Sequence, residues 1–168
     1  RDRSPSRGLG DVYKRQVRIT YVGRLDKDSE GLLLMTNNGD IINRMMRAAN
    51  KHEKEYKVTV DKPVTDEFLK EMAGGVPILD TVTRPCQVEK LGKYKFKIIL
   101  TQGLNRQIRR MCEALGYEVK ELRRVRIMNI ELGNLKPGEY RKVTDQELNE
   151  LYELIRDSKS EPTPWNNN

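Results

Sequence analysis

A cluster of acidic side chains occupies the segment 22–36, which reads VGRLDKDSEGLLLMT. Asp26 stands where a predicted strand meets a loop, and Asp28 and Glu30 follow it before a leucine-rich strand apolar enough to be buried. A carboxylate held at the end of a strand and paired with a cation can act as a nucleophile or as a base. Asp26 is therefore the first candidate for a catalytic group.

Other interpretations of the same segment compete with this one. A calcium loop of the EF-hand type fits the first six positions, but its twelfth position requires a bidentate Glu and is Asn37 here. It also requires a helix on each side, where strands are predicted, so this interpretation fails. A glycosidase pair needs a second carboxyl about 5 to 9 Å from the first. Spacing alone leaves that pair open, and it leaves open a plain solvent-exposed acidic turn.

A predicted amphipathic helix at 105–115 supplies a cation for such a carboxylate. At about 100° per residue, its core face consists of four apolar residues: Ile108, Met111, Cys112 and Leu115. Arg109 lies at the border of this face, where an arginine can bury its guanidinium and pair with a carboxylate. Arg106 and Arg110 point to the opposite side, where they either contact phosphates or simply face solvent.

Two further features suit a nucleic-acid partner. Arg123 and Arg124 form a second basic run directly after Leu122 on a predicted strand. Tyr56 heads another strand, and its ring offers a stacking surface for a base displaced from an RNA helix. An aromatic residue at this position is also compatible with an ordinary core or hairpin role.

Composition limits the class of protein. The chain has 168 residues, enough for one domain, with 32 Lys and Arg against 25 Asp and Glu and a net charge of +7. A basic balance favours polyanionic partners. No apolar run reaches the roughly 18 residues needed to cross a membrane, and the two cysteines and single histidine have no metal-ligand spacing. No membrane partner, disulfide or metal site is expected.

Short strands and helices alternate along 17–157, which predicts an α+β domain with a mainly antiparallel sheet. Strands are predicted at 18–25, 32–36, 56–60, 84–91, 94–101 and 122–132, and helices at 40–50, 65–74, 105–115 and 144–155. Asp40 and Thr65 are expected to cap two of the helices, and Thr144 with Glu147 forms a capping box for the last. Residues 1–16 are expected to be a leader that is non-native, similar to translated sequencing adaptor, or disordered; a native basic arm is the alternative. Residues 158–168 read as a disordered tail.

Six segments in order resemble the RsuA/RluF-type bacterial ribosomal pseudouridine synthases. They are GRLDKDSEGLLL at 23–34, TNNGD at 36–40, HEKEYKV at 52–58, GVPIL at 75–79, QGLNRQIRRMCE at 102–113 and RIMN at 126–129. Together they cover roughly 19–155, and several long motifs in one order are a specific signal. The segments 75–79 and 126–129 are most similar to the RluF branch, which acts on large-subunit ribosomal RNA.

The resemblance implies a pseudouridine synthase fold, a bent and mainly antiparallel sheet with flanking helices and a central cleft. It implies that Asp26 is the catalytic aspartate, that Tyr56 packs on the target base and assists proton removal, and that Arg109 pairs with the aspartate. Leu122 matches the apolar residue on the far side of the pocket. The expected substrate contacts are Arg24, Leu25, Arg106, Gln107, Arg110, Leu122, Arg123 and Arg124. The family uses no cofactor and no metal.

The expected reaction is isomerisation of a uridine to pseudouridine in 23S ribosomal RNA, by an enzyme that is cytoplasmic and monomeric. Asp26 either attacks a carbon or removes a ribose proton to give a glycal, and both routes need it ionised. The alternatives are the same chemistry on 16S ribosomal RNA or tRNA, or a non-catalytic RNA-binding module. Family members usually carry an S4-like domain and a first strand ahead of Ile19, so the chain is expected to be a catalytic-domain fragment.

Overall fold

The computed structural model describes residues 19–47 and 52–156 of the chain. The predicted leader at 1–16 and tail at 158–168 lie outside these residues. The strands are β1 (Thr20–Val22), β2 (Glu30–Gly31), β3 (Leu34–Thr36), β4 (Lys54–Val60), β5 (Pro77–Ile78), β6 (Thr81–Val82), β7 (Gln87–Gly92), β8 (Lys95–Leu100), β9 (Val119–Ile127) and β10 (Ile130–Glu131). The helices are α2 (Gly39–Met46), α3 (Asp66–Gly74), α4 (Gln107–Ala114) and α5 (Asp145–Ile155).

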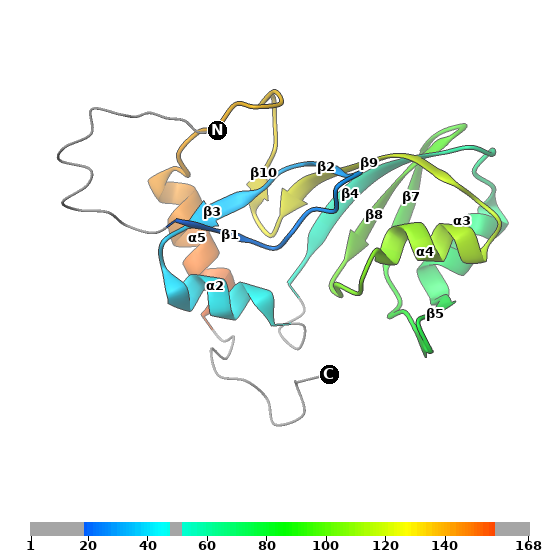
Figure 1. Cartoon of the computed structure of the whole chain (residues 1–168), viewed down its shortest axis with the longest axis horizontal. Coiled ribbons are helices and arrows are strands. Elements are labelled where there is room, and N and C mark those ends of the chain that lie inside the picture. Colours follow the sequence, from blue (N-terminus) through cyan, green and yellow to red (C-terminus); the bar gives the residue numbers. More distant parts are fainter. Residues whose placement is uncertain (1–18, 48–51, 157–168) are drawn as a thin grey trace.

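The central sheet runs β10-β9-β4-β8-β7 with antiparallel neighbours throughout (Figure 1). β2 joins the side of β9 in parallel, while β1 pairs with β3 and β5 with β6 in two small sheets. The predicted α+β class and mainly antiparallel sheet are confirmed. The parallel pair between β2 and β9 matters most for the site, because it ties the segment after Asp26 to the central sheet.

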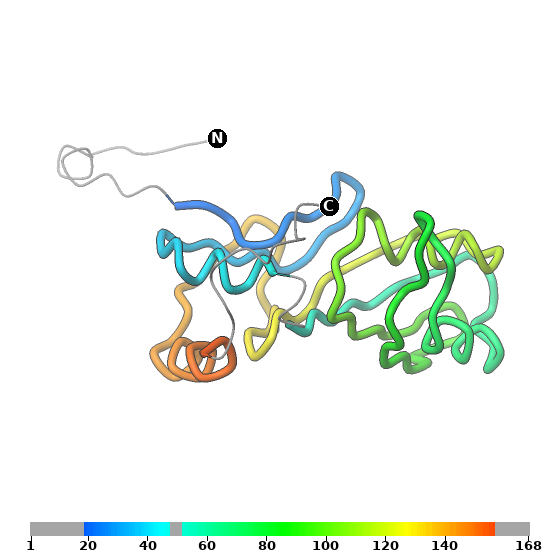
Figure 2. Tube along the Cα trace, turned by 90° about the horizontal axis from the view of Figure 1, so that it is seen from below, coloured from blue at the N-terminus to red at the C-terminus, as the bar shows by residue number. Residues whose placement is uncertain are grey.

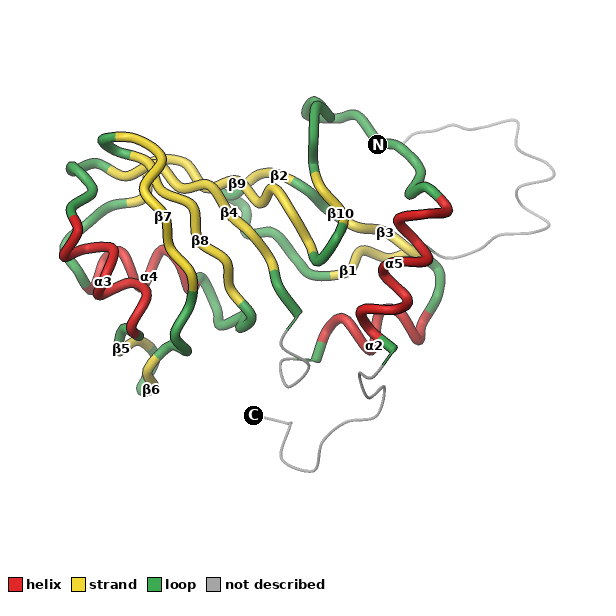
Figure 3. The backbone as a smooth tube through the Cα atoms, turned by 180° about the vertical axis from the view of Figure 1, so that it is seen from behind, coloured by secondary structure: helices red, strands yellow, loops and turns green. Residues whose placement is uncertain are grey.

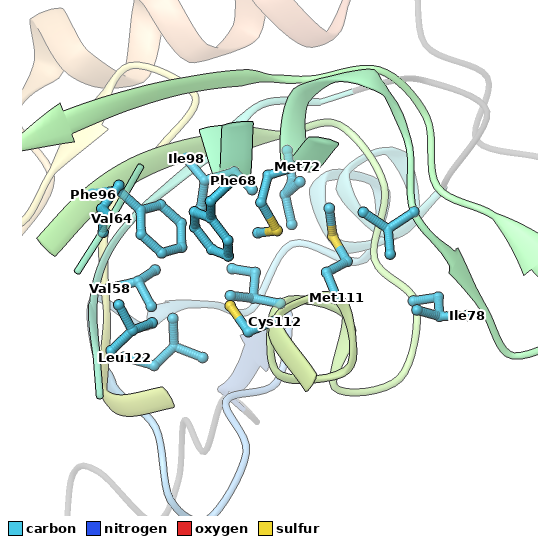
Figure 4. Close-up of a cluster of buried hydrophobic side chains, with 14 residues drawn as sticks. Val58, Val64, Phe68, Met72, Ile78, Phe96, Ile98, Met111, Cys112 and Leu122 are labelled. Carbon is cyan, nitrogen blue, oxygen red and sulfur yellow. The ribbon is translucent and has the colours of Figure 1, made fainter. Parts of the chain in front are cut away.

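One hydrophobic core lies between the central sheet and helices α3 and α4. β8 shows its origin in the sequence, since Phe96, Ile98 and Leu100 alternate with more exposed residues and so share one face. Figure 4 shows side chains from both helices meeting that face, and the rings of Phe68 and Phe96 make an edge-to-face contact at 5.3 Å. The sequence-predicted apolar face of α4 is confirmed here, with Met111 fully buried.

A second core lies at the other end of the central sheet (Figures 2 and 3). Helices α2 and α5 bring buried residues such as Ile41 and Leu151 against Val22 of β1 and Ile127 at the end of β9. Strands β4 and β9 connect the two cores, and their pairing shifts register between Glu55 and Tyr56. Such bulges bend a strand locally, and this one lies between the two cores.

Several predicted boundaries change in the structure. α2 is capped by Asn38 and not by Asp40, because the Asn38 side chain accepts from the backbone amides of Asp40 at 2.9 Å and Ile41 at 3.2 Å. The strand predicted at 122–132 is two strands, since Met128 adopts a left-handed φ of 54° and turns the chain. The Thr65 cap and the Thr144–Glu147 capping box are confirmed.

None of the helices in the described ranges combines the length and the apolar character that a bilayer crossing requires; α5, at 11 residues, is the longest of them.

Candidate active site

A pocket of about 410 Å³ lies where the two cores meet. One face of the central sheet contributes the side chains that line it: Lys54 and Tyr56 from β4, Leu100 from β8, and Leu122, Arg124 and Ile127 from β9. The other walls come from the loop between β1 and β2, from the end of α2 together with His52, and from residues 102–108 at the start of α4. A concave site of this size is typical of ligand pockets.

The loop between β1 and β2 places Asp26 at this pocket. Gly23 ends the extended chain with a φ of +80°, which a residue with a side chain rarely adopts. A tight turn follows, in which the Ser29 amide donates to the Asp26 carbonyl at 2.9 Å. β2 then pairs with β9, so the loop is tied down directly after the turn. The Asp26 side chain is 39% exposed and therefore accessible to a substrate.

Tyr56 and Leu122 come to the same pocket from neighbouring strands. Leu122 on β9 lies opposite Val58 of β4, and Tyr56 is two residues before Val58, so regular alternation places the side chains of Tyr56 and Leu122 on one face of the sheet. The predicted gathering of Asp26, Tyr56 and Leu122 in one cleft is confirmed by the lining of the pocket. Their catalytic roles remain predictions.

The predicted ion pair between Arg109 and Asp26 is wrong in this structure. Arg109 donates from Nη2 to the Asp28 carbonyl oxygen at 2.7 Å, and its Nε lies 3.5 Å from the Asp28 carboxylate. The cation that reaches Asp26 is Arg106, with Nη1 at 3.9 Å from Oδ2. Arg109 is also not among the residues that line the pocket. It supports the turn after Asp26 from outside.

The helical projection gave the wrong direction for the Arg106 side chain, because Arg106 precedes the helix and does not belong to it. It is the N-cap of α4 and adopts a left-handed conformation with φ 48° and ψ 40°, so a helical projection does not give its direction. Its guanidinium makes two hydrogen bonds to the Asp28 carboxylate, at 3.0 and 2.9 Å. These bonds lower the pKa of Asp28 to about 2. Asp28 therefore stays ionised and holds the cation beside Asp26.

Three other predicted substrate contacts are already engaged within the protein. Arg110 donates to the Asn105 carbonyl at 2.9 Å and to the Asn105 side chain at 2.8 Å. Arg123 pairs with Glu30 at 2.7 Å on an exposed surface. Gln107 lines the pocket but is 4% exposed, and its side-chain oxygen accepts from the Leu104 amide at 3.1 Å. It shapes the loop ahead of α4, because its amide is occupied there.

Arg124 was predicted to bind phosphate, and the structure contradicts this. Its side chain is 2% exposed, and its guanidinium donates to the main-chain carbonyls of Gly23, Arg24 and Leu32. A guanidinium enclosed in this way is not exposed to the phosphates of a nucleic acid. By contrast, Arg24 and Leu25 line the pocket, and their substrate contacts remain predictions.

A family model described as RNA pseudouridylate synthase matches residues 5–114. The chain belongs to this family. The resemblance inferred from the motifs is thereby confirmed.

Individual relatives agree with this family assignment. The dual-specificity RNA pseudouridine synthase RluF of Escherichia coli strain K12 is 56% identical over 154 residues, which cover 92% of this chain and 53% of that protein. An uncharacterized RNA pseudouridine synthase of Aquifex aeolicus is 38% identical over 140 residues, covering 83% and 58% respectively. A crystal structure of a pseudouridylate synthase has a TM-score of 0.76 at 33% identity, covering 79% of this chain and 59% of that one, which confirms the predicted fold. The chain spans about half the length of RluF.

Lys54 is a pocket residue that the sequence analysis did not identify. Burial lowers the pKa of its ammonium, and the nearby Arg124 guanidinium lowers it further. Among the described residues its ammonium has no hydrogen-bond or ion-pair partner. The signal for its position was its spacing, because it lies two residues before Tyr56 and alternate residues of a strand share one face. Lys54 and Arg124 thus make the floor of the pocket basic.

Within the ranges 19–47 and 52–156, no group of three or more His, Cys, Asp and Glu side chains is arranged to hold a metal ion.

His52, the one histidine of the chain, is expected to make the stability of the fold depend on pH. It is 6% exposed, and burial lowers its pKa below the ordinary value, although a hydrogen bond to the Met45 backbone acts in the opposite direction. The unfolded chain therefore binds the proton more readily than the folded chain does. The stability gained from neutral His52 is present above the ordinary pKa of about 6.5 and is lost as the pH falls through the lower folded-state pKa.

We expect the free energy of unfolding in urea to be smaller at pH 5 than at pH 7.5, and His52→Gln to reduce that difference. Carboxyl groups titrate mostly below this window, so the comparison isolates the histidine. Equal pH dependence of the parent and the variant would show that His52 is not the responsible group.

Proposed function

We propose that the chain isomerises uridine to pseudouridine in RNA, with Asp26 as the essential carboxylate. The observation that carries this proposal is the position of Asp26 in a pocket with Tyr56 and Leu122, in a chain that belongs to the RNA pseudouridylate synthase family. The net charge of +7 and the basic pocket floor suit a polyanionic substrate.

The reaction breaks the bond between N1 of uracil and C1′ of the ribose, turns the base, and joins C5 to C1′. The C5 proton is then released to solvent. Asp26 either forms a covalent bond to the substrate or removes a ribose proton to give a glycal, and both routes require its charged form. A pocket that excludes water keeps the detached base from being lost, while the ring of Tyr56 offers a surface on which the base can stack.

Ribosomal RNA, and 23S RNA in particular, is the substrate that we propose. The support is the 56% identity to RluF, together with the motifs at 75–79 and 126–129. RluF is named a dual-specificity RNA pseudouridine synthase, which favours a second RNA substrate, and tRNA is the alternative that we would test. The proposal includes a cytoplasmic, monomeric enzyme, and the free thiols of Cys86 and Cys112 suit a reducing compartment.

RNA that carries tritium at C5 of uridine tests the activity directly. We expect the chain to release tritium to solvent from 23S RNA transcripts, and sequencing of pseudouridine positions to locate the modified uridine. Parallel reactions with 16S RNA and tRNA separate the alternative substrates. Tight RNA binding with no release from any of the three RNAs would replace this proposal with the non-catalytic binding module.

A further inference from the structure

Arg124 is one of the most buried side chains of the described residues, and no carboxylate among these residues forms an ion pair with its charge. Its neighbours on β9 behave differently. Arg123 pairs with Glu30 at 2.7 Å, and Arg126 pairs with Glu55 at 2.9 Å and with Glu53 at 3.2 Å. Burying an ion costs free energy unless it is compensated. The contacts that compensate Arg124 should therefore indicate what it does.

The Arg124 guanidinium donates three hydrogen bonds, and they go to the two sides of the loop that carries Asp26. Nη2 and Nη1 donate to the carbonyls of Gly23 and Arg24, each at 3.3 Å, and these residues precede Asp26. Nε donates to the carbonyl of Leu32 at 2.9 Å, after the loop has turned back. A planar guanidinium with donors along two edges can hold two chain segments at a fixed separation.

The main chain of Arg124 acts on the same loop. Its carbonyl accepts from the Leu32 amide at 2.8 Å, and it lies opposite Gly31 in the parallel pair of β2 and β9. It also lies opposite Tyr56 in the pair of β9 and β4. Arg124 therefore contacts the ends of the aspartate loop and is the direct neighbour of the tyrosine.

We propose that Arg124 is a positioning residue, whose guanidinium holds the loop 23–32 so that the Asp26 carboxylate faces the pocket beside Tyr56. This role rests on the proposed isomerase function, because Arg124 acts by fixing the position of Asp26 for that reaction. Arg124 itself does not touch the substrate.

The test compares Arg124→Lys with Arg126→Lys. Lysine keeps the charge, but a single ammonium cannot replace donors spread over both edges of a guanidinium. A displacement of about 1 Å at a reacting group can cost on the order of 100-fold in rate. We expect Arg124→Lys to lower kcat by 10- to 100-fold, with KM and the salt dependence of RNA binding unchanged. Arg126 lies on the same strand and has its ion pairs with Glu53 and Glu55, so Arg126→Lys should leave kcat unchanged.

Hydrogen exchange gives a readout that does not depend on activity. Amides in 23–32 should exchange faster in Arg124→Lys than in the parent, while amides of β4 and β8 exchange at parent rates. Unchanged exchange in 23–32, or faster exchange throughout the chain, would overturn the positioning role even if the parent is active. If the parent protein showed no turnover, the proposed isomerase function would be wrong. The exchange data would still decide whether Arg124 holds the loop.

A second variant covers the case in which Arg124→Lys fails to fold. Arg124→Gln removes the charge and keeps a planar group with two donors. A folded Arg124→Gln protein with lowered kcat and loosened 23–32 amides supports the proposal. Loss of folding in both variants would make Arg124 a folding residue and overturn it.

Discussion

Asp26→Asn is expected to lower pseudouridine formation by at least about 10³-fold, because an amide is neither a nucleophile nor a base under these conditions. The Asp26 side chain is 39% exposed, and its ion pair with Arg106 is long, at 3.9 Å. Little folding free energy depends on an exposed pair of this kind. The variant should therefore keep the parent's unfolding free energy and its affinity for RNA while losing tritium release.

Asp28→Asn is the matched control, because it removes a carboxylate two residues away in the same loop. Asp28 takes most of the arginine contacts, with two hydrogen bonds from Arg106 and a 3.5 Å approach of Arg109 Nε. Exposed ion pairs are worth about 1 kcal/mol or less, so we expect kcat to remain within about tenfold of the parent. Measurable turnover by Asp26→Asn together with none by Asp28→Asn would transfer the catalytic role to Asp28.

The residues that the sequence placed correctly are those whose position depends on strand order and alternation. Asp26 follows the first strand, Tyr56 belongs to β4, and Leu122 belongs to the neighbouring β9, so their strands bring them to one pocket. The hairpin of β7 and β8 and the capped helices were predictable for the same reason. Local pattern determines local structure, and the family motif then relates elements that are distant in the sequence.

The errors arose where one residue departs from a regular backbone. The left-handed conformation of Arg106 turns its side chain toward the aspartate loop, and a helical projection assumes that no such residue is present. For Arg124 the signal was available, because it lies two residues after the buried Leu122 and so shares its inward face. The basic residues Arg123 and Arg124 were both interpreted as exposed, although side chains alternate along a strand and every second one points inward.

Gly31→Ala is expected to destabilise the fold by about 3 kcal/mol or more. Gly31 has a φ of +120°, a conformation that an alanine adopts only with strain. A Cβ at this position would lie 2.2 Å from the carbonyl oxygen and 2.5 Å from the amide nitrogen of Arg124. Because both are main-chain atoms of a central strand, they cannot move aside as a side chain could, and overpacking of this kind typically costs 1–3 kcal/mol beyond the backbone strain.

The measurement is the free energy of unfolding in urea, compared between Gly31→Ala and the control variant Gly74→Ala. Gly74 ends α3, and an added Cβ there would have no atom within 4 Å, so that variant should match the parent or gain up to about 1 kcal/mol from the better helix propensity of alanine. A loss of 3 kcal/mol is a large share of the 5–15 kcal/mol that keeps a typical domain folded. It should also reduce activity at temperatures where the variant remains folded, because the displaced partner of Arg124 is the segment that follows Asp26. If Gly31→Ala unfolds within 0.5 kcal/mol of the parent, β2 and β9 do not pair as closely as described, and the aspartate loop must be held by other contacts.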